Sequence, residues 1–405
     1  MRAVKITAIE TIQLEEFPNL FWVHVHSDEG LVGLGEAFFG PNVAVAYIHE
    51  TAAPRLLGQD PLAIERHSRT LLDSYVGFSG SGAEMRGLSA LDIALWDLFG
   101  QATNQPIHQL LGGLSRPAIR VYNTCAGYRY VRQDVGQLTK NWGLSTRPSE
   151  GPYEDLEAFL HRADELAQSL LEQGITGMKI WPFDFAAERW GGHYISAREL
   201  DQALEPFRKI RAAVGDKMDV MVDLHTLWNL PTAKRIFRAL EEFEPFWFED
   251  PIKMTSADDL AELAASTHVP ICASETLATR SAFRELLERN AVGVVMLDLS
   301  WVGGLSEARK IAAMAETYHL PVAPHDCTGP VVYTASVHLS LNATNALVQE
   351  SVRAFYTGWY RELVTDLPWI EEGYVYPMAG PGLGTRMLPD VLKRADATIR
   401  RTPAD

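Results

Sequence analysis

The stretch MDVMVDLHTLWNLPTAKRIFRALEEFEPFWFED, residues 218–250, contains two apolar runs separated by a charged segment with helical spacing. The runs cover residues 218–224 and 245–250, and their near-continuous apolar character is typical of strands that are covered on both faces. A strand, a helix and a second strand in this order form a parallel unit, because a parallel pair needs a crossover. The stretch therefore predicts an α/β fold.

The same rhythm continues on both sides of this stretch. The further β-rich runs cover residues 120–125, 176–181, 269–275, 292–299, 320–325 and 345–350. Eight such runs separated by helices predict a closed (β/α)7β TIM-like barrel, which we assign to a catalytic domain at residues 119–365. In such a barrel the C-terminal ends of the strands and the loops that follow them build the active site.

The remaining segments have a different pattern. Residues 4–12 and 21–37 alternate apolar and polar side chains around the turn signal at 28–30, and residues 89–101, SALDIALWDLFGQ, predict a helix that ends at Gly100. Residues 1–118 therefore predict an N-terminal α+β capping domain. The Pro- and Gly-containing tail, residues 366–405, is expected to leave the barrel and pack on this domain. A long polar loop, residues 127–153, is expected on the catalytic face.

The composition limits the classes of function. The chain has 405 residues, 47% of them hydrophobic, and a formal net charge of −16. This charge argues against binding to nucleic acid or to an anionic membrane surface. The sequence contains no signal-peptide pattern and no run of 18 uncharged apolar residues, and its three cysteines are too few for a disulfide framework. These features predict a cytoplasmic globular protein.

Three carboxylates stand at the ends of consecutive predicted strands: Asp223, Glu249 and Glu275. In a barrel they converge at the mouth, where they repel one another unless a cation lies between them. A hard divalent ion with oxygen ligands resolves this conflict, and we expect one Mg²⁺ per chain. Each acid by itself could also be a solvated strand end or a helix cap. Three in register on consecutive strands favour the metal site.

Other polar residues also end strands. Asp298 and His325 end neighbouring strands, so that the carboxylate can fix the tautomer of the imidazole and raise its basicity. His225 lies two residues after Asp223, and strand alternation places both side chains on one face. Lys179 ends the second strand of the barrel and is expected to face the negative charge of a substrate. Trp181 is expected to shape the pocket.

The pattern of these residues resembles the enolase superfamily, specifically the mandelate racemase subgroup and its galactonate- and mannonate-type acid-sugar dehydratases. The resemblance covers nearly the whole chain, in stretches that include VDLH, FWFEDP, ASETL, LDLSWVGGLSEARKIAAMAE and APHDCTGPV. It implies that Asp223, Glu249 and Glu275 bind the metal ion and that His325 acts with Asp298. It also implies that Glu350 hydrogen-bonds the substrate carboxylate.

The resemblance further implies that loops of the N-terminal domain, at about residues 16–22 and 38–43, close over the substrate. The residues expected to contact substrate are Asn19, Trp22, Phe39, Tyr128 and Trp181. Many members of the superfamily carry Lys-x-Lys on the second barrel strand, whereas this chain has Lys179-Ile-Trp181. This departure disfavours a two-base racemase and favours elimination in one direction.

The expected reaction is therefore dehydration of a sugar acid, an aldonate or aldarate, to a 2-keto-3-deoxy acid. His325 takes the proton next to the carboxylate, Lys179 and Glu350 stabilise the ene-diolate, and His225 protonates the leaving 3-hydroxyl. The two histidines could exchange roles for another sugar epimer. The alternatives are an epimerase, racemase or lactone cycloisomerase that uses the same first step, and a non-catalytic sugar-acid binder. The protein is expected to be a homo-oligomer.

Overall fold

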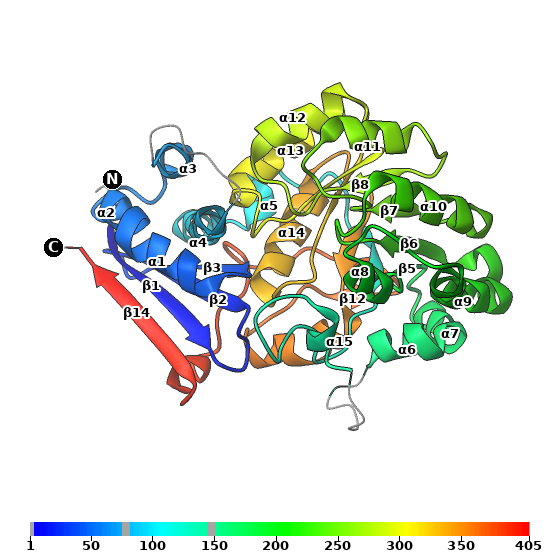
Figure 1. The fold of residues 1–405 in the computed structure, drawn as a ribbon. Helices are drawn as coiled ribbons and strands as arrows, with labels where there is room; N and C mark the ends of the chain where they lie inside the picture. The colour runs from blue at the N-terminus through cyan, green and yellow to red at the C-terminus, as the bar shows by residue number, and fades with distance from the viewer. Residues whose placement is uncertain (1–3, 75–81, 145–150, 152, 405) are drawn as a thin grey trace.

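The computed structural model describes residues 4–74, 82–144, 151 and 153–404. Figure 1 shows a smaller N-terminal domain beside a larger barrel, and the last strand of the chain lies on the smaller domain. Residues 145–150 and 152 of the predicted polar loop, and residues 1–3 of the predicted N-terminal domain, lie outside the described residues. Within that part of the chain, none of the helices is both long and apolar enough to span a membrane.

The N-terminal domain is a four-stranded antiparallel sheet covered by helices. The strand order is β14-β1-β2-β3. Its strands are β1 (Ile6–Leu14), β2 (Leu20–Ser27), β3 (Val32–Phe38) and β14 (Ala397–Pro403). The helices of this domain are α1 (Pro41–Tyr47), α2 (Ala53–Leu56), α3 (Ile64–Leu72), α4 (Ala83–Thr103) and α5 (Ile107–Leu110). The predicted antiparallel strands and the α+β character are therefore confirmed.

The long helix α4 packs on β3, and two glycines allow the two backbones to approach closely. A Cβ atom on Gly33 would lie 2.0 Å from the Ala94 carbonyl oxygen, and one on Gly35 would lie 1.9 Å from the Ala90 carbonyl oxygen. Any side chain at these two positions would force the helix away from the sheet. This packing positions the end of β3, which leads into the mouth of the barrel.

The prediction that this helix ends at Gly100 is wrong, because α4 continues to Thr103 and ends with Asn104 in the left-handed conformation. Gly100 instead lies inside the helix, at the point where the C-terminal tail packs closely on it: a Cβ atom on Gly100 would lie 2.3 Å from the Gly382 Cα atom. The glycine is required by the C-terminal tail that crosses the helix, and it does not serve as a stop signal.

The eight predicted barrel strands are confirmed. They are β4 (Ile119–Thr124), β5 (Gly177–Ile180), β6 (Asp219–Asp223), β7 (Trp247–Glu249), β8 (Ile271–Ala273), β9 (Val294–Leu297), β10 (Val322–Pro324) and β11 (Gln349–Ser351). Neighbouring strands from β4 to β10 pair in parallel, and β11 pairs with β4. A bridge between Val322 and Ala346 joins the segment before β11 to β10, which closes the barrel.

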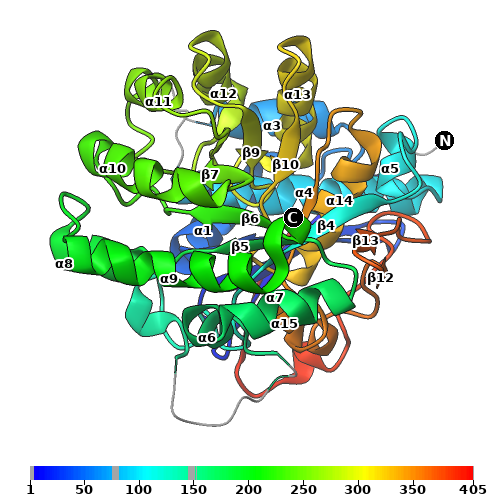
Figure 2. The same cartoon turned by 90° about the vertical axis from the view of Figure 1, so that its right-hand side faces the viewer.

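Helices connect the strands and surround them, as Figure 2 shows for α7 and for α9 to α13. The helices of the barrel are α6 (Asp155–His161), α7 (Ala163–Glu172), α8 (Asp184–Trp190), α9 (Ala197–Val214), α10 (Leu230–Leu240), α11 (Ala257–Ala264), α12 (Thr279–Glu288), α13 (Gly304–Thr317), α14 (Pro330–Asn342) and α15 (Arg353–Tyr356). Side chains of Ser196, Asn229 and Ser256 cap α9, α10 and α11 by accepting backbone hydrogen bonds. These caps fix where each helix begins after its loop.

The inside of the barrel is packed with side chains below the strand ends. Its cluster consists of Tyr122, Met221, Trp247, Cys272, Val294, Met296, Ala323 and Val348, all buried. By strand alternation, Met221 and Trp247 lie on the same inward face as Asp223 and Glu249. The carboxylates therefore rest on an apolar floor and cannot reach solvent through the barrel.

The C-terminal tail contacts both parts of the molecule. Strand β13 (Tyr374–Val375) pairs antiparallel with β4 of the barrel and with β12 (Ile370–Glu371). Strand β14 pairs antiparallel with β1, so that it forms one edge of the N-terminal sheet (Figure 1). The first part of the tail thus lies on the barrel, whereas Gly382 and Leu383 contact α4 and β14 joins the N-terminal sheet, so the rest of the tail packs on the N-terminal domain as predicted.

Candidate active site

Three carboxylates meet at the mouth of the barrel. Asp223 and Glu249 are the last residues of β6 and β7 and are paired in register, while Glu275 follows the end of β8 by two residues. One oxygen from each of these side chains lies within 4.8 Å of the others, and all three residues are buried. The structure therefore brings together the residues that the sequence marked as metal ligands.

Lys179, the third residue of β5, enters this cluster from the neighbouring strand. Its Nζ atom lies 2.5 Å from Glu249 Oε1, 2.9 Å from Glu350 Oε1 and 3.4 Å from Asp223 Oδ2. Burial alone would lower the pKa of this lysine, but the charges of Glu249 and Glu350 outweigh burial and raise the pKa well above its usual value. Lys179 is therefore an ammonium group in the site.

The cluster carries more negative charge than one lysine can balance. Burial raises the pKa of both Glu249 and Glu275, and the charge of Asp223 raises it further. For Asp223 itself, the charges of His225 and Lys179 outweigh burial and keep the pKa below its usual value. Glu275 Oε2 is buried and accepts no hydrogen bond among the described residues. Hard oxygen donors, unbalanced negative charge and a buried carboxylate oxygen that accepts no hydrogen bond among the described residues together fit a Mg²⁺ ion.

His325 forms a dyad with Asp298 on one side of the cluster. Its Nδ1 atom lies 2.7 Å from Asp298 Oδ2, and the other oxygen of Asp298 accepts hydrogen bonds from the backbone and hydroxyl of Ser300, at 2.6 and 2.5 Å. The ring stacks on Trp301 at 5.4 Å. Since Nδ1 is engaged, Nε2 is the free nitrogen, and it lies 3.1 Å from Glu275 Oε2. Despite burial, neighbouring carboxylates, led by Glu275, raise the pKa of His325 well above its usual value.

His225 forms a second dyad, with Asp184 as its partner. Its Nδ1 atom lies 2.7 Å from Asp184 Oδ2, and its Nε2 atom lies 3.3 Å from Asp223 Oδ2. The Trp181 ring and the imidazole form a T-shaped pair, with 5.7 Å between their centroids. Burial would lower the pKa of His225, but the charges of Asp223 and Asp184 outweigh it and raise the pKa to about 10. Both histidines thus use Nδ1 for a carboxylate and turn Nε2 to the cluster.

Sequence reasoning missed Asp184. This residue begins α8, five positions after Lys179, in the segment WPFD. An acid in the first turn of a helix is ordinary, because it interacts favourably with the helix dipole. Only the path of the loop between β5 and α8 brings the carboxylate to His225, and no periodicity in the sequence encodes that path.

Glu350 lies beside the cluster with both oxygens engaged. One oxygen accepts a hydrogen bond from the Thr124 hydroxyl and lies near Lys179, and the other accepts a hydrogen bond from the Asp326 backbone N–H at 2.7 Å. Burial would raise the pKa of this carboxyl, but the charges of Lys179 and His325 keep it below its usual value. Glu350 is therefore ionised and is held in place by its neighbours.

A pocket opens above these groups. Lys179, Asp223, His225, Glu275 and His325 line its base. Its walls come from the end of β3, from the loop after β4 and from the loops after β5 and β9. The main wall residues are Phe38, Phe39, Tyr130, Val131, Trp181 and Trp301. The structure thus places two of the predicted substrate contacts, Phe39 and Trp181, at the pocket.

The structure does not bring the other three predicted substrate contacts to this pocket. Trp22 is fully buried and donates a hydrogen bond to Glu36 Oε2 at 2.6 Å. Tyr128 donates its hydroxyl hydrogen bond to Glu362 at 3.1 Å. Asn19 donates hydrogen bonds to the carbonyl oxygens of Val131 and Asp134, at 2.7 and 2.9 Å. Asn19 therefore holds the loop that forms one wall of the pocket.

Comparison with known families agrees with this geometry. Residues 4–112 match the N-terminal domain of mandelate racemase and muconate lactonizing enzyme, and residues 162–391 match the enolase C-terminal domain-like family. The chain belongs to the enolase superfamily. Its two matched regions are the cap and most of the barrel, in the order that the fold shows. The protein is thus an enzyme of this superfamily, and its N-terminal domain is of the kind found in mandelate racemase and muconate lactonizing enzyme.

Individual relatives extend over almost the full length of this enolase-superfamily member. It is 32% identical to a D-galactonate dehydratase of Ralstonia nicotianae, over 94% of this chain and 91% of that protein. It is 30% identical to a D-xylonate dehydratase of Haloferax volcanii, over 97% of this chain and 89% of that protein. A crystal structure of an enolase of the mandelate racemase subgroup from Agrobacterium tumefaciens is 56% identical, covers 99% of both chains and superposes with a TM-score of 0.87.

Proposed function

We propose that this enzyme is a Mg²⁺-dependent lyase that dehydrates a sugar acid, an aldonate or aldarate, to a 2-keto-3-deoxy acid. The observation that carries the proposal is the pair of dyads, His325 with Asp298 and His225 with Asp184. Each dyad presents one Nε2 atom to the same carboxylate cluster. Elimination of water needs one group that takes a proton and one that gives a proton, and the two dyads supply both.

The reaction needs two proton transfers, and each of the two histidines carries out one of them. His325 Nε2 takes the proton from the carbon next to the substrate carboxylate, and the electron pair moves toward that carboxylate to give an ene-diolate. The bond between the third carbon and its hydroxyl oxygen then breaks as His225 Nε2 gives a proton, so that the oxygen leaves as water. The enol takes up a proton at the third carbon and becomes the 2-keto-3-deoxy acid.

Lys179 stabilises the negative charge that develops on the substrate between these two steps, and Glu350 holds Lys179 in place. The ammonium group of Lys179 is fixed by Glu249 and Glu350 at the base of the pocket, where it stabilises negative charge on the substrate. Glu350, held by Thr124 and the Asp326 backbone, keeps this lysine charged and oriented. The site is therefore organised before the substrate arrives.

Asp223, Glu249 and Glu275 are the residues that would hold Mg²⁺. When bound, the ion supplies positive charge that stabilises the substrate carboxylate in its ene-diolate form and lowers the pKa of the neighbouring histidines. The dehydratases among the relatives, which are named for D-galactonate and D-xylonate, support the reaction type.

Epimerisation is the second candidate function, because two histidines could also exchange a proton on opposite faces of one carbon. Trp181, which stands where many members of the superfamily carry a second lysine, offers no proton carrier on the strand that holds Lys179. Its indole instead packs against the His225 ring. Elimination is therefore favoured over racemisation.

The test is a panel of aldonates and aldarates incubated with enzyme and Mg²⁺ in D₂O. We expect at least one acid to yield a 2-keto-3-deoxy acid, and we expect a chelator to abolish this activity until Mg²⁺ is restored. Deuterium incorporation next to the carboxylate without 2-keto acid would establish epimerisation instead. Binding of acids with neither exchange nor product would show that the protein is a non-catalytic binder.

A further inference from the structure

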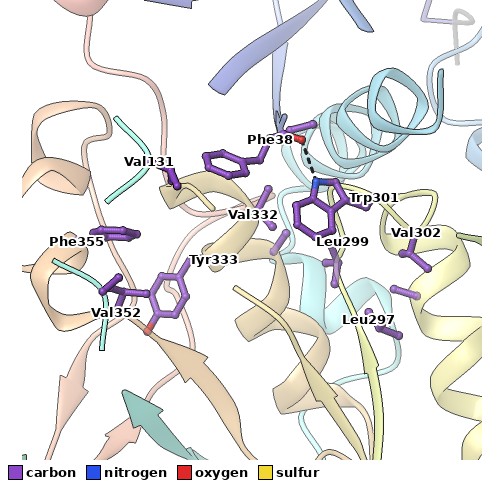
Figure 3. Packing of buried hydrophobic residues seen from close by; sticks show 14 of the residues in the cluster. Phe38, Val131, Leu297, Leu299, Trp301, Val302, Val332, Tyr333, Val352 and Phe355 are labelled. Carbon is purple, nitrogen blue, oxygen red and sulfur yellow. Dashed lines mark hydrogen bonds between the residues drawn. The ribbon is translucent and has the colours of Figure 1, made fainter. Parts of the chain in front are cut away.

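One part of the pocket wall is apolar, although the proposed substrate is a sugar derivative. Phe38, Phe39, Val131 and Trp301 form most of this part. Figure 3 shows Phe38, Val131 and Trp301 within one buried hydrophobic cluster that continues into the barrel. The apolar lining is thus continuous with the core and does not consist of single exposed side chains.

The single side-chain polar atom of these four wall residues, Trp301 Nε1, is engaged by the protein, whereas two polar groups elsewhere in the lining are not. Trp301 Nε1 donates to the Phe38 carbonyl oxygen at 2.9 Å, and Arg86 Nε donates to the same oxygen at 3.1 Å. Gln137 Nε2 donates to the Tyr130 hydroxyl oxygen at 3.2 Å, which leaves the proton of that hydroxyl available. Trp181 Nε1 is buried and has no hydrogen-bond partner among the described residues. Phe38, Phe39, Val131 and Trp301 therefore offer no free side-chain group to a substrate hydroxyl, whereas Tyr130 and Trp181, elsewhere in the described lining, each offer one.

Backbone conformation gives independent support. Phe39 has a φ angle of 63° and Val131 has a φ angle of 51°. This left-handed region suits Gly and Asn and is costly for other residues, above all for a β-branched one such as valine. At both positions the chain carries an apolar side chain that lines the pocket, in a conformation that a polar Asn would adopt more easily. The apolar surface is therefore maintained at a conformational cost, which is characteristic of functional positions.

We propose that the substrate is a deoxy sugar acid, whose terminal carbon carries no hydroxyl group and packs against Phe39 and Val131. This inference rests on the proposed dehydratase function. A hydroxyl placed on this wall would lose its hydrogen bonds to water without replacement, whereas a methyl group there gains by burial. The Tyr130 hydroxyl recognises one oxygen of the substrate on the side of the pocket nearer the catalytic groups.

The first experiment compares matched pairs of acids that differ only in the terminal hydroxyl. D-galactonate is paired with D-fuconate and L-mannonate with L-rhamnonate, and kcat/KM for 2-keto acid formation is measured for each. In the pair with the correct configuration we expect the deoxy acid to be preferred by roughly 10- to 100-fold, the range for rejection of one hydroxyl by an apolar pocket. Equal turnover, or a preference for the hydroxylated acid, overturns this inference but leaves the dehydratase function intact. Absence of 2-keto acid from every aldonate and aldarate overturns both.

The second experiment changes the wall. Val131→Asn suits the left-handed backbone and adds an amide partner for a hydroxyl, so that the preference for the deoxy acid should narrow by roughly tenfold. Val131→Ala is the matched control: it also removes the valine side chain but remains apolar, and it should retain the preference for the deoxy acid. If both variants change the ratio of kcat/KM between the deoxy and the hydroxylated acid equally, the wall does not discriminate between the two terminal groups and the inference is wrong. Turnover of the deoxy acid by both variants shows that they are folded.

Discussion

Two nitrogen atoms, Nε2 of His225 and Nε2 of His325, carry out the proposed proton transfers. Each is available because a carboxylate engages the Nδ1 atom of the same ring. Asp184 and Asp298 each lie 2.7 Å from the Nδ1 atom of their histidine. A carboxylate in this position fixes the tautomer and the ring orientation. The two histidines are therefore distinguished by their place in the site, and their functions can be separated by exchange of the substrate α-hydrogen with solvent.

We predict opposite effects of the two histidine substitutions on this exchange. His325→Asn removes the base, so that both turnover and α-exchange in D₂O should fall by roughly 10²- to 10⁴-fold. His225→Asn removes the acid, so that dehydration should fall while slow α-exchange survives. Proton NMR of the substrate in D₂O measures both. Loss of exchange in His225→Asn together with its survival in His325→Asn would reverse the assignment.

A related prediction concerns Asp184. Asp184→Asn can still contact the His225 ring but no longer carries the charge that fixes its tautomer, so that dehydration should fall by roughly tenfold or more while α-exchange is retained. Asp298→Asn is the matched control in the other dyad and should lower exchange and dehydration together. If Asp184→Asn leaves dehydration unchanged, Asp184 has no positioning role.

At the scale of elements, the contact between β3 and α4 sets the position of the part of the pocket wall that the cap contributes. Gly33 and Gly35 face Ala94 and Ala90, two residues apart on the strand and four apart on the helix. Strand β3 then runs directly into Phe38 and Phe39 at the pocket. The position of the pocket wall therefore depends on how closely these two backbones approach.

We predict that Gly35→Ala lowers the free energy of unfolding by about 1–3 kcal/mol or more, because the new methyl group meets the backbone oxygen of Ala90 and the helix must move. The urea unfolding midpoint measures this loss. Gly30→Asn is the control, since Gly30 has a φ angle of 77° that Asn tolerates, and a Cβ atom at this position would have no neighbouring atom within 4 Å. Equal midpoints for Gly35→Ala and the unaltered protein would contradict the close packing.

The elements that could be predicted from the sequence are those whose pattern is local. The barrel strands are near-continuous apolar runs, so both the runs and the polar residues that end them, such as Asp223 and Glu249, are visible in the chain. The roles of Asn19 and Trp22 could not be predicted, because side-chain directions at loops and between domains depend on long-range packing. The prediction at Gly100 was wrong for the same reason: a side chain at position 100 would collide with the backbone of Gly382, which is far away in the sequence.

At the scale of the whole molecule, two buried contacts join the cap, the barrel and the tail. Glu36 of β3 accepts hydrogen bonds from the backbone N–H groups of Val331 and Val332 at the start of α14, at 3.1 and 3.0 Å. At the other end of α14, His338 faces His108 of α5 with 3.0 Å between their Nδ1 atoms, and its Nε2 atom lies 3.1 Å from the Leu383 carbonyl oxygen of the tail. One barrel helix therefore connects all three parts of the chain.

The contact at His338 should make the assembled molecule sensitive to acid. Burial lowers the pKa of His338 to about 4, below its ordinary value of 6.5, because the charged ring would be desolvated and would face His108. The unfolded chain therefore binds a proton more readily than the folded protein between these two pH values. The contribution of His338 to the free energy of unfolding is fully present above pH 6.5 and is lost as the pH falls toward 4. The total loss is on the order of 3 kcal/mol.

We predict that His338→Gln, which cannot take up a proton, flattens the fall in stability between pH 6.5 and pH 4 relative to the unaltered protein, even if it lowers stability at neutral pH. Urea unfolding at a series of pH values gives the slopes, and comparing slopes removes the contribution of other groups that titrate in the same range. His268→Asn, at a side chain that is 75% exposed, is the control and should leave the slope unchanged. If His338→Gln has the same slope as the unaltered protein, His338 is not the group whose protonation loosens the contact between cap, barrel and tail.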